Sequence, residues 1–231
     1  MIKADELPGK AAEILKEIRK QYKVAFEPLT MQGKELQILQ VTDIEPLLAG
    51  KDPFKETEDF PFWVKLWEAS MVLAHTMATL PPRPGQNLLE LGAGLAAPGL
   101  VAAAMGYQVT LSDYEPIILD FQRVSAAASG LKGVEFKIID WKNPPALPPF
   151  DTIIGAEILF REEFFEPLLN IFDKLLAPGG TIYLAHDMRR KSLNPFLQLA
   201  EEKYEIAFST RKLKSREESM TVVVNRLRRR V

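Results

Sequence analysis

The sequence predicts an α/β fold built around one mostly parallel sheet. From residue 87 onward, short apolar runs of strand length alternate with longer runs of helical character. One strand-like run leads directly into a glycine turn, and the chain closes with two further strand-like runs. Such alternation is typical of βαβ units, in which helices cover both faces of a parallel sheet.

Size and composition indicate one globular catalytic unit. The chain has 231 residues, 47% hydrophobic and 26% charged, which is typical of soluble domains. The absence of cysteine excludes disulfides and thiolate nucleophiles, and two histidines argue against a histidine-rich metal site. A formal net charge of −2 gives no general attraction to nucleic acid. With neither a secretory signal nor a membrane-spanning apolar stretch evident, we expect a cytoplasmic protein.

Residues 1–60 are expected to form an extension ahead of the main domain, which would span residues 61–231. Apolar residues recur at helical spacing from Lys10 to Tyr22 and predict an amphipathic helix. The stretch from Tyr22 to Ile44 alternates around a Gln-Gly turn and predicts a β-hairpin. A charged loop is expected at residues 49–59. This extension is a candidate lid or substrate-recognition element.

The expected elements of the main domain follow in order. An apolar run from Trp63 to Leu80 predicts a helix, which the proline-rich segment at 81–84 ends. A turn is expected at 177–180. Parallel strands are expected at 87–91, 108–112, 134–139, 152–156 and 181–185, and helices at 97–105, 116–129, 162–176 and 194–203. The last two runs, 204–210 and 219–227, are expected to form an antiparallel hairpin.

The central motif is a strand that runs into a glycine turn and then a helix. Its sequence over residues 87–99 is Asn-Leu-Leu-Glu-Leu-Gly-Ala-Gly-Leu-Ala-Ala-Pro-Gly. Gly92 and Gly94 permit a tight turn and let a ligand approach the backbone closely. The helix that follows begins with free N–H groups, and Pro98 suits its first turn. This arrangement indicates a nucleotide-like ligand.

Two acidic residues accompany the glycine turn, Glu90 just before it and Asp113 nineteen residues after Gly94. Asp113 ends the second strand, where a carboxylate can accept hydrogen bonds from both hydroxyls of an adenosine ribose. The glycines alone also fit NAD, so they leave two cofactors open. Glu90 favours a cofactor with a cationic amino group, such as S-adenosylmethionine, because a carboxylate there would repel a pyrophosphate. The late start of the sheet and its antiparallel end also favour methyl transfer.

Further motifs extend this pattern over most of the chain. They are Pro61-Phe62-Trp63 with Trp67, Glu90-Leu91-Gly92-Ala93-Gly94, Val109-Thr110-Leu111-Ser112-Asp113, Asp140-Trp141 and Gly155-Ala156-Glu157-Ile158-Leu159-Phe160. From about Pro61 to the C-terminus, the chain resembles the class I methyltransferases, and within them the protein-lysine methyltransferases of family 16. The resemblance implies a Rossmann-like, doubly wound, seven-stranded sheet that ends in an antiparallel hairpin.

The resemblance also implies S-adenosylmethionine as the cofactor and assigns residues to it. Trp67 is expected near the cofactor, Asp113 on its ribose, and Trp141 beside its adenine, where an aromatic ring gains by stacking. Ala156 is expected at the floor of the pocket. The implied cofactor set is Trp67, Glu90, Gly92, Ala93, Gly94, Asp113, Tyr114, Asp140, Trp141 and Ala156, and no metal is expected.

Glu157 and Phe160 depart from the family pattern. The family has Asp-x-x-Tyr after the fourth strand, whereas this sequence has Glu-Ile-Leu-Phe. Glu157 keeps the carboxylate, but Phe160 has no hydroxyl to orient an amine. Glu157 is the candidate catalytic residue. It would position a lysine amine, whose deprotonation at pH 7.5 costs about 4 kcal/mol in water.

The expected function is methylation of a lysine side chain on a protein partner. A small-molecule methyltransferase and a non-catalytic S-adenosylmethionine-binding protein are the alternatives. Nucleic-acid methylation is disfavoured, because no Asn-Pro-Pro-Tyr type of loop follows the fourth strand. His186 is expected at the ligand-binding edge of the sheet, as a surface group or a substrate contact. The arginines of residues 226–230 are expected to lie on a solvated terminal strand.

Overall fold

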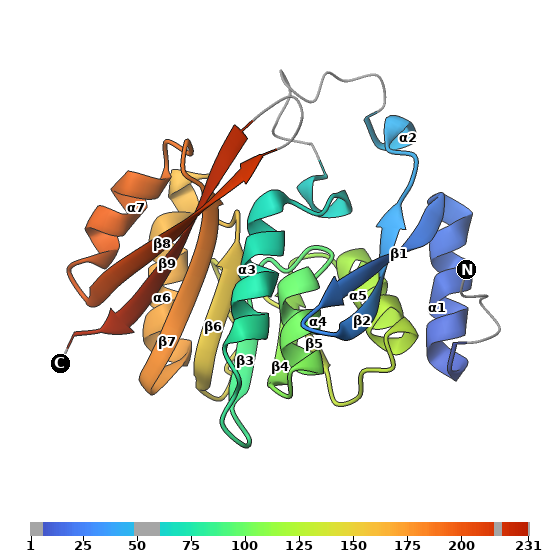
Figure 1. Ribbon diagram of the computed structural model, residues 1–231, viewed down its shortest axis with the longest axis horizontal. Coiled ribbons are helices and arrows are strands. Elements are labelled where there is room, and N and C mark those ends of the chain that lie inside the picture. The colour runs from blue at the N-terminus through green and yellow to red at the C-terminus, as the bar shows by residue number, and fades with distance from the viewer. Residues whose placement is uncertain (1–6, 49–60, 215–218, 231) are drawn as a thin grey trace.

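The protein is built on one seven-stranded sheet with helices on both faces (Figure 1). The computed structural model describes residues 7–48, 61–214 and 219–230. The strand order is β5-β4-β3-β6-β7-β9-β8. The strands from β5 to β7 are parallel to their neighbours, whereas β9 is antiparallel to both β7 and β8. The predicted mostly parallel sheet with an antiparallel end is therefore confirmed.

The predicted elements of the main domain are present. The strands are β3 (Asn87–Glu90), β4 (Gln108–Asp113), β5 (Glu135–Ile138), β6 (Phe150–Ala156), β7 (Leu176–Asp187), β8 (Tyr204–Lys214) and β9 (Ser219–Arg229). The helices are η3 (Phe62–Val64), α3 (Glu68–Thr79), α4 (Ala97–Ala104), α5 (Pro116–Ala128), η4 (Glu162–Phe164), α6 (Phe165–Leu175) and α7 (Leu193–Ala200). β7 starts earlier than predicted and includes the expected turn at 177–180.

The segment before α3 is not part of one long helix, so the prediction for Trp63 to Leu80 was wrong in its first third. A short 3₁₀ turn, η3, is followed by extended backbone at Lys65 and Trp67. The indole Nε1 of Trp67 donates a hydrogen bond of 2.7 Å to the carbonyl of Phe62 and closes this turn. The apolar pattern indicates that this segment is buried against the core, and residues of a turn can be buried there as well as those of a helix.

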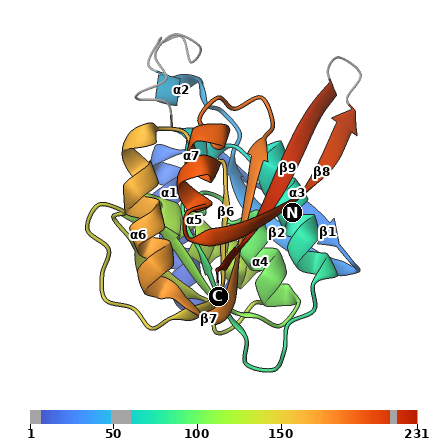
Figure 2. The same cartoon turned by 90° about the vertical axis from the view of Figure 1, so that its left-hand side faces the viewer.

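Successive side chains of each strand pack alternately into two hydrophobic layers, one on each face of the sheet. Leu88 of β3 belongs to the core under α3, α4 and α5, whereas its neighbour Leu89 belongs to the core under α6 and α7. The same alternation occurs at Ile153 and Ile154 of β6. Figure 2 shows α6 and α7 on one side of the sheet and α3 and α4 on the other.

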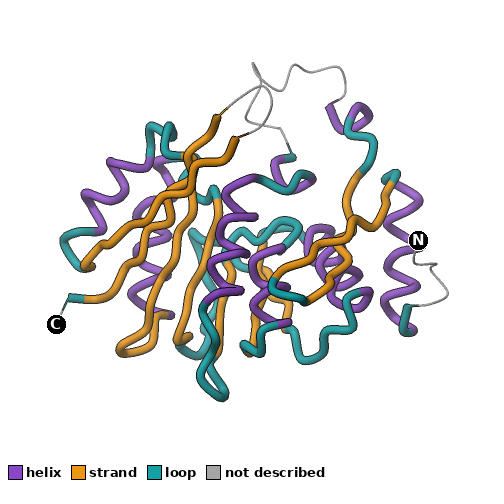
Figure 3. The backbone as a smooth tube through the Cα atoms, in the orientation of Figure 1, coloured by secondary structure: helices purple, strands orange, loops and turns teal. Residues whose placement is uncertain are grey.

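The N-terminal region contains the predicted helix and hairpin. They are α1 (Gly9–Gln21), β1 (Val24–Met31) and β2 (Lys34–Val41), followed by the short α2 (Glu45–Leu48). β1 and β2 form a separate two-stranded sheet (Figure 3). Their turn places Gln32 at φ 46° and Gly33 at φ 74°, as a two-residue hairpin turn with right-handed strand twist requires.

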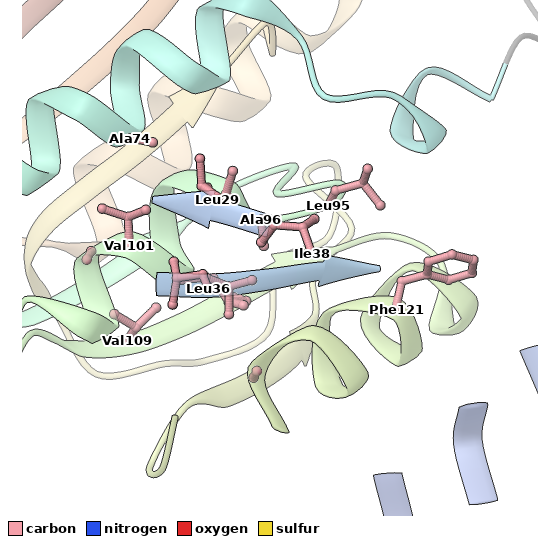
Figure 4. Packing of buried hydrophobic residues seen from close by; sticks show 14 of the residues in the cluster. Leu29, Leu36, Ile38, Ala74, Leu95, Ala96, Val101, Val109 and Phe121 are labelled. Carbon is pink, nitrogen blue, oxygen red and sulfur yellow. The ribbon is translucent and has the colours of Figure 1, made fainter. Parts of the chain in front are cut away.

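This hairpin packs into the main core. The hydroxyl of Ser125 accepts a hydrogen bond of 2.9 Å from the N–H of Leu39, and that of Ser129 accepts one of 2.9 Å from Gln37. Leu36 and Ile38 are buried in the same cluster as the side chains of α4 and α5 (Figure 4). The described part of the extension therefore shares its core with the main domain. The predicted loop at 49–59 and the boundary at residue 60 lie outside the described residues, and the lid function stays a prediction.

The C-terminal arginines anchor β9 to the rest of the fold. Arg229 Nη2 donates hydrogen bonds to the carbonyls of Phe172 (3.2 Å) and Asp173 (2.6 Å), near the C-terminal end of α6. A cation there also complements the helix dipole. Arg228 Nε donates to the hydroxyl of Thr181 at 3.3 Å. These contacts give two of the predicted solvated arginines a structural role.

Candidate active site

The glycine turn lies at the carboxyl end of β3 and is held by both neighbouring strands. The N–H of Leu91 donates to the carbonyl of Ile154 in β6, and that of Ala93 donates to Ser112 in β4, each at 2.9 Å. Gly92 and Gly94 have φ values of 57° and 52°, which favour glycine. The predicted tight turn is therefore present at the edge where open parallel sheets bind ligands.

Trp141 lies directly over this turn. A Cβ on Gly92 would be 3.0 Å from Cζ2 of Trp141 and 3.0 Å from Cγ2 of Ile158. The indole ring also contacts Phe164 edge-on, with ring centroids 5.3 Å apart, and Phe160 at 6.3 Å. Trp141 is partly exposed and Phe160 is 45% exposed, so an aromatic surface borders the glycine turn.

Asp113 closes the turn from the side of β4. Its Oδ2 accepts a hydrogen bond from the N–H of Gly94, and its Oδ1 accepts one from Tyr114, both at 2.8 Å. Burial raises the pKa of Asp113 to about 6, although both hydrogen bonds oppose the shift. Tyr114 itself is 63% exposed beside it. A carboxylate accepts about four hydrogen bonds, so Asp113 keeps acceptor capacity for a ligand hydroxyl.

Glu90 is buried against the first turn of α4. Its Oε2 accepts a hydrogen bond of 2.9 Å from the N–H of Gly99 in the first turn of α4. The side chain is 1% exposed, and burial raises its pKa well above the usual value. The structure thus gives Glu90 a role in joining β3 to α4. Its predicted pairing with a cofactor amino group stays a prediction.

Trp63 contacts the glycine turn, although Trp67 was the predicted residue. A Cβ on Gly94 would lie 3.6 Å from the Cα and the carbonyl oxygen of Trp63. The Trp63 ring packs between Tyr22 and Phe121, at centroid distances of 5.9 Å and 5.0 Å. Trp63 was part of the Pro-Phe-Trp motif in the sequence, but the neighbouring residues did not indicate which of the two tryptophans contacts the glycine turn. The role of Trp67 stays a prediction.

Two other predicted residues lie at the same sheet edge without a ligand-directed contact. Asp140 is exposed and its Oδ1 accepts a hydrogen bond of 2.9 Å from the N–H of Lys142. Ala156 ends β6 opposite Ala185 of β7 and is partly exposed. Their positions agree with a cofactor edge, and their individual roles stay predictions.

Glu157 follows β6 with a φ of 57°, which is strained for a residue other than glycine. Its Oε1 accepts a hydrogen bond of 2.7 Å from the N–H of Asp187, and its Oε2 accepts one of 2.5 Å from Arg190 Nε. The Arg190 Nη2 also contacts this carboxylate. The side chain is 12% exposed, and burial raises its pKa although Arg190 opposes the shift. Glu157 is therefore held in one orientation at the end of the strand.

An open groove of about 450 Å³ adjoins Glu157. Two of its lining residues, Asp187 and Arg190, donate the hydrogen bonds that hold the Glu157 carboxylate. Phe160, which belongs to the aromatic surface, also lines the groove. Its lining residues are Phe160, Glu162, Asp187, Arg189, Arg190, Lys191 and Ser192.

His186 is in the core, so both expectations for it, a surface group and a substrate contact, were wrong. It is 0% exposed in β7, and its register places it opposite Val223 of β9. Neither ring nitrogen has a hydrogen-bond partner among the described residues. Burial lowers its pKa to about 3. Strand alternation turns this side chain towards the α6 and α7 layer, which position along the strand alone did not reveal.

Acidification is expected to destabilise the protein through His186. The imidazole stays neutral in the folded state down to a pKa of about 3, whereas in the unfolded chain it gains a proton below about pH 6.5. Its contribution to stability is therefore complete above pH 6.5 and is lost as the pH falls towards 3. Between pH 6.5 and 5.0 the loss is about 2 kcal/mol.

Urea unfolding of His186→Leu at both pH values tests this, because the variant should lose about 2 kcal/mol less than the wild type. The exposed histidine provides the control, and His75→Gln should keep the full pH dependence. Equal losses in wild type and His186→Leu would show that other groups cause the acid sensitivity.

Within residues 7–48, 61–214 and 219–230, no group of three or more histidine, aspartate or glutamate side chains is placed to hold a metal ion. No helix in these segments is both long and apolar enough to cross a bilayer.

Sequence comparisons connect this site with known methyltransferases. The sequence profile of the family described as lysine methyltransferase matches residues 55–203. Protein N-lysine methyltransferase METTL21A of Xenopus tropicalis is 29% identical over 148 residues, which cover 62% of this chain and 68% of that protein. Histone-arginine methyltransferase METTL23 of Mus musculus is 37% identical over 111 residues, which cover 45% of this chain and 44% of that protein. The match thus spans less than half of the second relative.

Solved structures share the fold. Precorrin-6y C5,15-methyltransferase from Geobacter metallireducens superposes with a TM-score of 0.60 at 18% identity, covering 72% of this chain and 91% of that one. The N-methyltransferase NodS from Bradyrhizobium japonicum, in complex with S-adenosylhomocysteine, gives a TM-score of 0.57 at 19% identity, covering 80% and 96%. At these identities the likeness supports the fold alone.

Proposed function

The chain belongs to the lysine methyltransferase family, and from this premise we propose that it methylates a lysine side-chain amine on a protein partner. It is an S-adenosylmethionine-dependent methyltransferase. The observation that carries the proposal is the convergence of the glycine turn, Asp113, Trp141 and Glu157 at one edge of the sheet. This edge combines groups suited to the cofactor with a separate groove for an acceptor.

The residues at this edge fit S-adenosylmethionine. The Asp113 carboxylate has acceptor capacity for the two ribose hydroxyls. The Trp141 ring offers an aromatic face for a neutral purine. The absence of a Cβ at Gly92 lets the side chains of Trp141 and Ile158 pack closely against the glycine turn. When bound, the cofactor supplies an electrophilic methyl group on a sulfonium, so the protein needs no covalent nucleophile.

The task left to the protein is to hold a neutral amine in line with that methyl group. A lysine side chain has an unperturbed pKa of about 10.4, and desolvation lowers it. The exposed rings of Phe160 and Tyr114 at this edge would exclude water from an amine that enters beside them. We propose that Glu157 orients this amine, using the acceptor capacity that Asp187 and Arg190 leave free. Because Asp187 and Arg190 already donate hydrogen bonds to the Glu157 carboxylate, this group is better suited to orient the amine than to remove its proton.

The test is transfer of a radiolabelled methyl group from the cofactor into the proteins of a cell lysate, followed by hydrolysis to amino acids. Label in methyllysine supports the proposal. Label in methylarginine would assign the activity that the METTL23 relatives are named for, and label only in the low-mass fraction would indicate a small-molecule acceptor. Binding of S-adenosylhomocysteine without any transfer would identify a non-catalytic binding protein.

Glu157→Gln in the same assay tests the orienting role. We expect a loss of transfer of about tenfold or more at an unchanged affinity for S-adenosylhomocysteine, because an amide replaces the carboxylate that faces the amine. Glu166→Gln on the exposed face of α6 is the matched control and should retain full transfer. Full activity of Glu157→Gln would remove Glu157 from the reaction.

A further inference from the structure

The outer strand β8 presents an open edge. It is the last strand of the seven-stranded sheet and pairs with β9 on one side only. Figure 2 shows the β8–β9 hairpin rising beyond the helical layers. Phe208, in the middle of β8, is 73% exposed, more than any other large hydrophobic residue in the described part of the chain. An exposed apolar strand edge is a template for pairing with another chain.

The backbone polarity of this edge follows from the register with β9. The N–H of Arg230 donates to the carbonyl of Lys203 at 2.9 Å, so odd-numbered residues of β8 bond to β9. Even-numbered residues direct their N–H and C=O groups outward. Over the described segments, no backbone partner from a loop or turn occupies these groups at Ile206, Phe208 or Thr210. The edge therefore offers a row of unpaired donors and acceptors.

The sequence of β8 is complementary to itself in the antiparallel direction. With a two-fold axis at Phe208, the residues whose backbone groups point outward lie opposite each other in the two copies. Ile206 then faces Thr210 of the second copy. On the opposite face of the strand, Glu205 then faces Arg211 twice. Both side chains are exposed, and neither takes part in an ion pair within the described residues. Opposite charges directly across a strand pair stabilise that register.

We propose that the chain forms a two-fold symmetric dimer in which the β8 strands of two copies pair antiparallel about Phe208. The two sheets become one continuous sheet, and the exposed Phe208 rings meet across the axis. The interface is isologous, so each contact occurs twice. The partner is thus a second copy of this chain, and the ligand edge at β3, β4 and β6 remains open. This dimer can form whichever acceptor the enzyme methylates.

Charge reversal with rescue tests this register by sedimentation velocity of the full chain at low ionic strength. The wild type should sediment as a dimer at micromolar concentration. Glu205→Arg and Arg211→Glu should each weaken dimerisation by about tenfold or more, because two attractive pairs become repulsive. The double variant Glu205→Arg/Arg211→Glu should restore the dimer. Glu13→Arg on α1 is the control and should leave it unchanged.

A second variant tests the backbone pairing. Thr210→Pro removes an outward-facing N–H without removing a bond to β9, and it should abolish the dimer. Unchanged binding of S-adenosylhomocysteine by each variant would show that the fold is retained. A wild type that stays monomeric at about 100 micromolar, a concentration at which even a weak dimer would form, would overturn the proposal. So would a dimer that ignores Thr210→Pro, or a double variant that fails to recover.

Discussion

Replacing Asp113 with alanine is expected to weaken the binding of S-adenosylhomocysteine by about ten- to a hundredfold. Asp113 is the one carboxylate in the described structure that hydrogen-bonds the glycine turn from β4, at 2.8 Å from the Gly94 nitrogen. Its loss would remove the proposed acceptor for the ribose hydroxyls and also the hydrogen bond that holds the turn. Hydrogen bonds to a charged group contribute about 1.5–3 kcal/mol each, which sets this range. Calorimetric titration at pH 7.5 measures it.

Asp151→Ala is the matched control. This carboxylate accepts a hydrogen bond from the N–H of Asn87 at 3.2 Å, at the opposite end of β3 and β6. Its loss should lower stability without changing cofactor affinity. Wild-type affinity in Asp113→Ala, or tighter binding of NAD than of S-adenosylhomocysteine, would contradict the assigned cofactor edge.

The affinity should also depend on pH through the same group. Burial raises the pKa of Asp113 to about 6, and the ionised carboxylate is the stronger acceptor. Affinity should be constant above about pH 7 and fall as the pH drops through 6, because the protonated fraction grows. Asp113→Asn should bind weakly and show no such fall. An identical pH profile in the two proteins would assign the titration to another residue.

Sequence reasoning succeeded where local patterns carry the information. Short apolar runs, separated by helical runs and by proline and glycine, predicted the strands of the main sheet and their order along the chain. The strand, glycine turn and helix at 87–99 were predicted from local backbone requirements, and Gly92 and Gly94 adopt the left-handed conformation that the turn needs. The sequence also predicted that the second strand ends near Asp113, and β4 does end there, while the contact of Asp113 with the ribose stays a prediction.

The features that were missed depend on contacts between distant segments. The burial of His186 depends on the pairing of β7 with β9, and the choice between Trp63 and Trp67 depends on packing against Tyr22 and Phe121. The Arg190 guanidinium reaches Glu157 from a different loop, 33 residues along the chain. The spacing of residues along the sequence does not reveal any of these contacts.

Gly99→Ala is expected to destabilise the protein by about 3–5 kcal/mol. A Cβ there would lie 2.3 Å from Cδ2 of Leu111 and 2.4 Å from Oε2 of Glu90, both closer than real contacts allow. The core must therefore shift, and the Glu90 carboxylate must leave the N–H of Gly99. Overpacking costs about 1–3 kcal/mol, and a buried acceptor that loses its donor costs a similar amount. Urea unfolding measures the sum.

Gly9→Ala in the first turn of α1 controls for the general effect of alanine in a helix. No atom lies within 4 Å of its added Cβ, so stability should change by less than about 1 kcal/mol and in the favourable direction. A double-mutant cycle with Leu111→Ala then isolates the clash. The double variant should lose less stability than the sum of the two single losses, because the smaller side chain makes room for the new methyl group. Full additivity would mean that Leu111 is not the obstacle. Since the N–H of Gly99 binds Glu90 and so joins α4 to β3, the variant should also loosen the glycine turn and weaken S-adenosylhomocysteine binding.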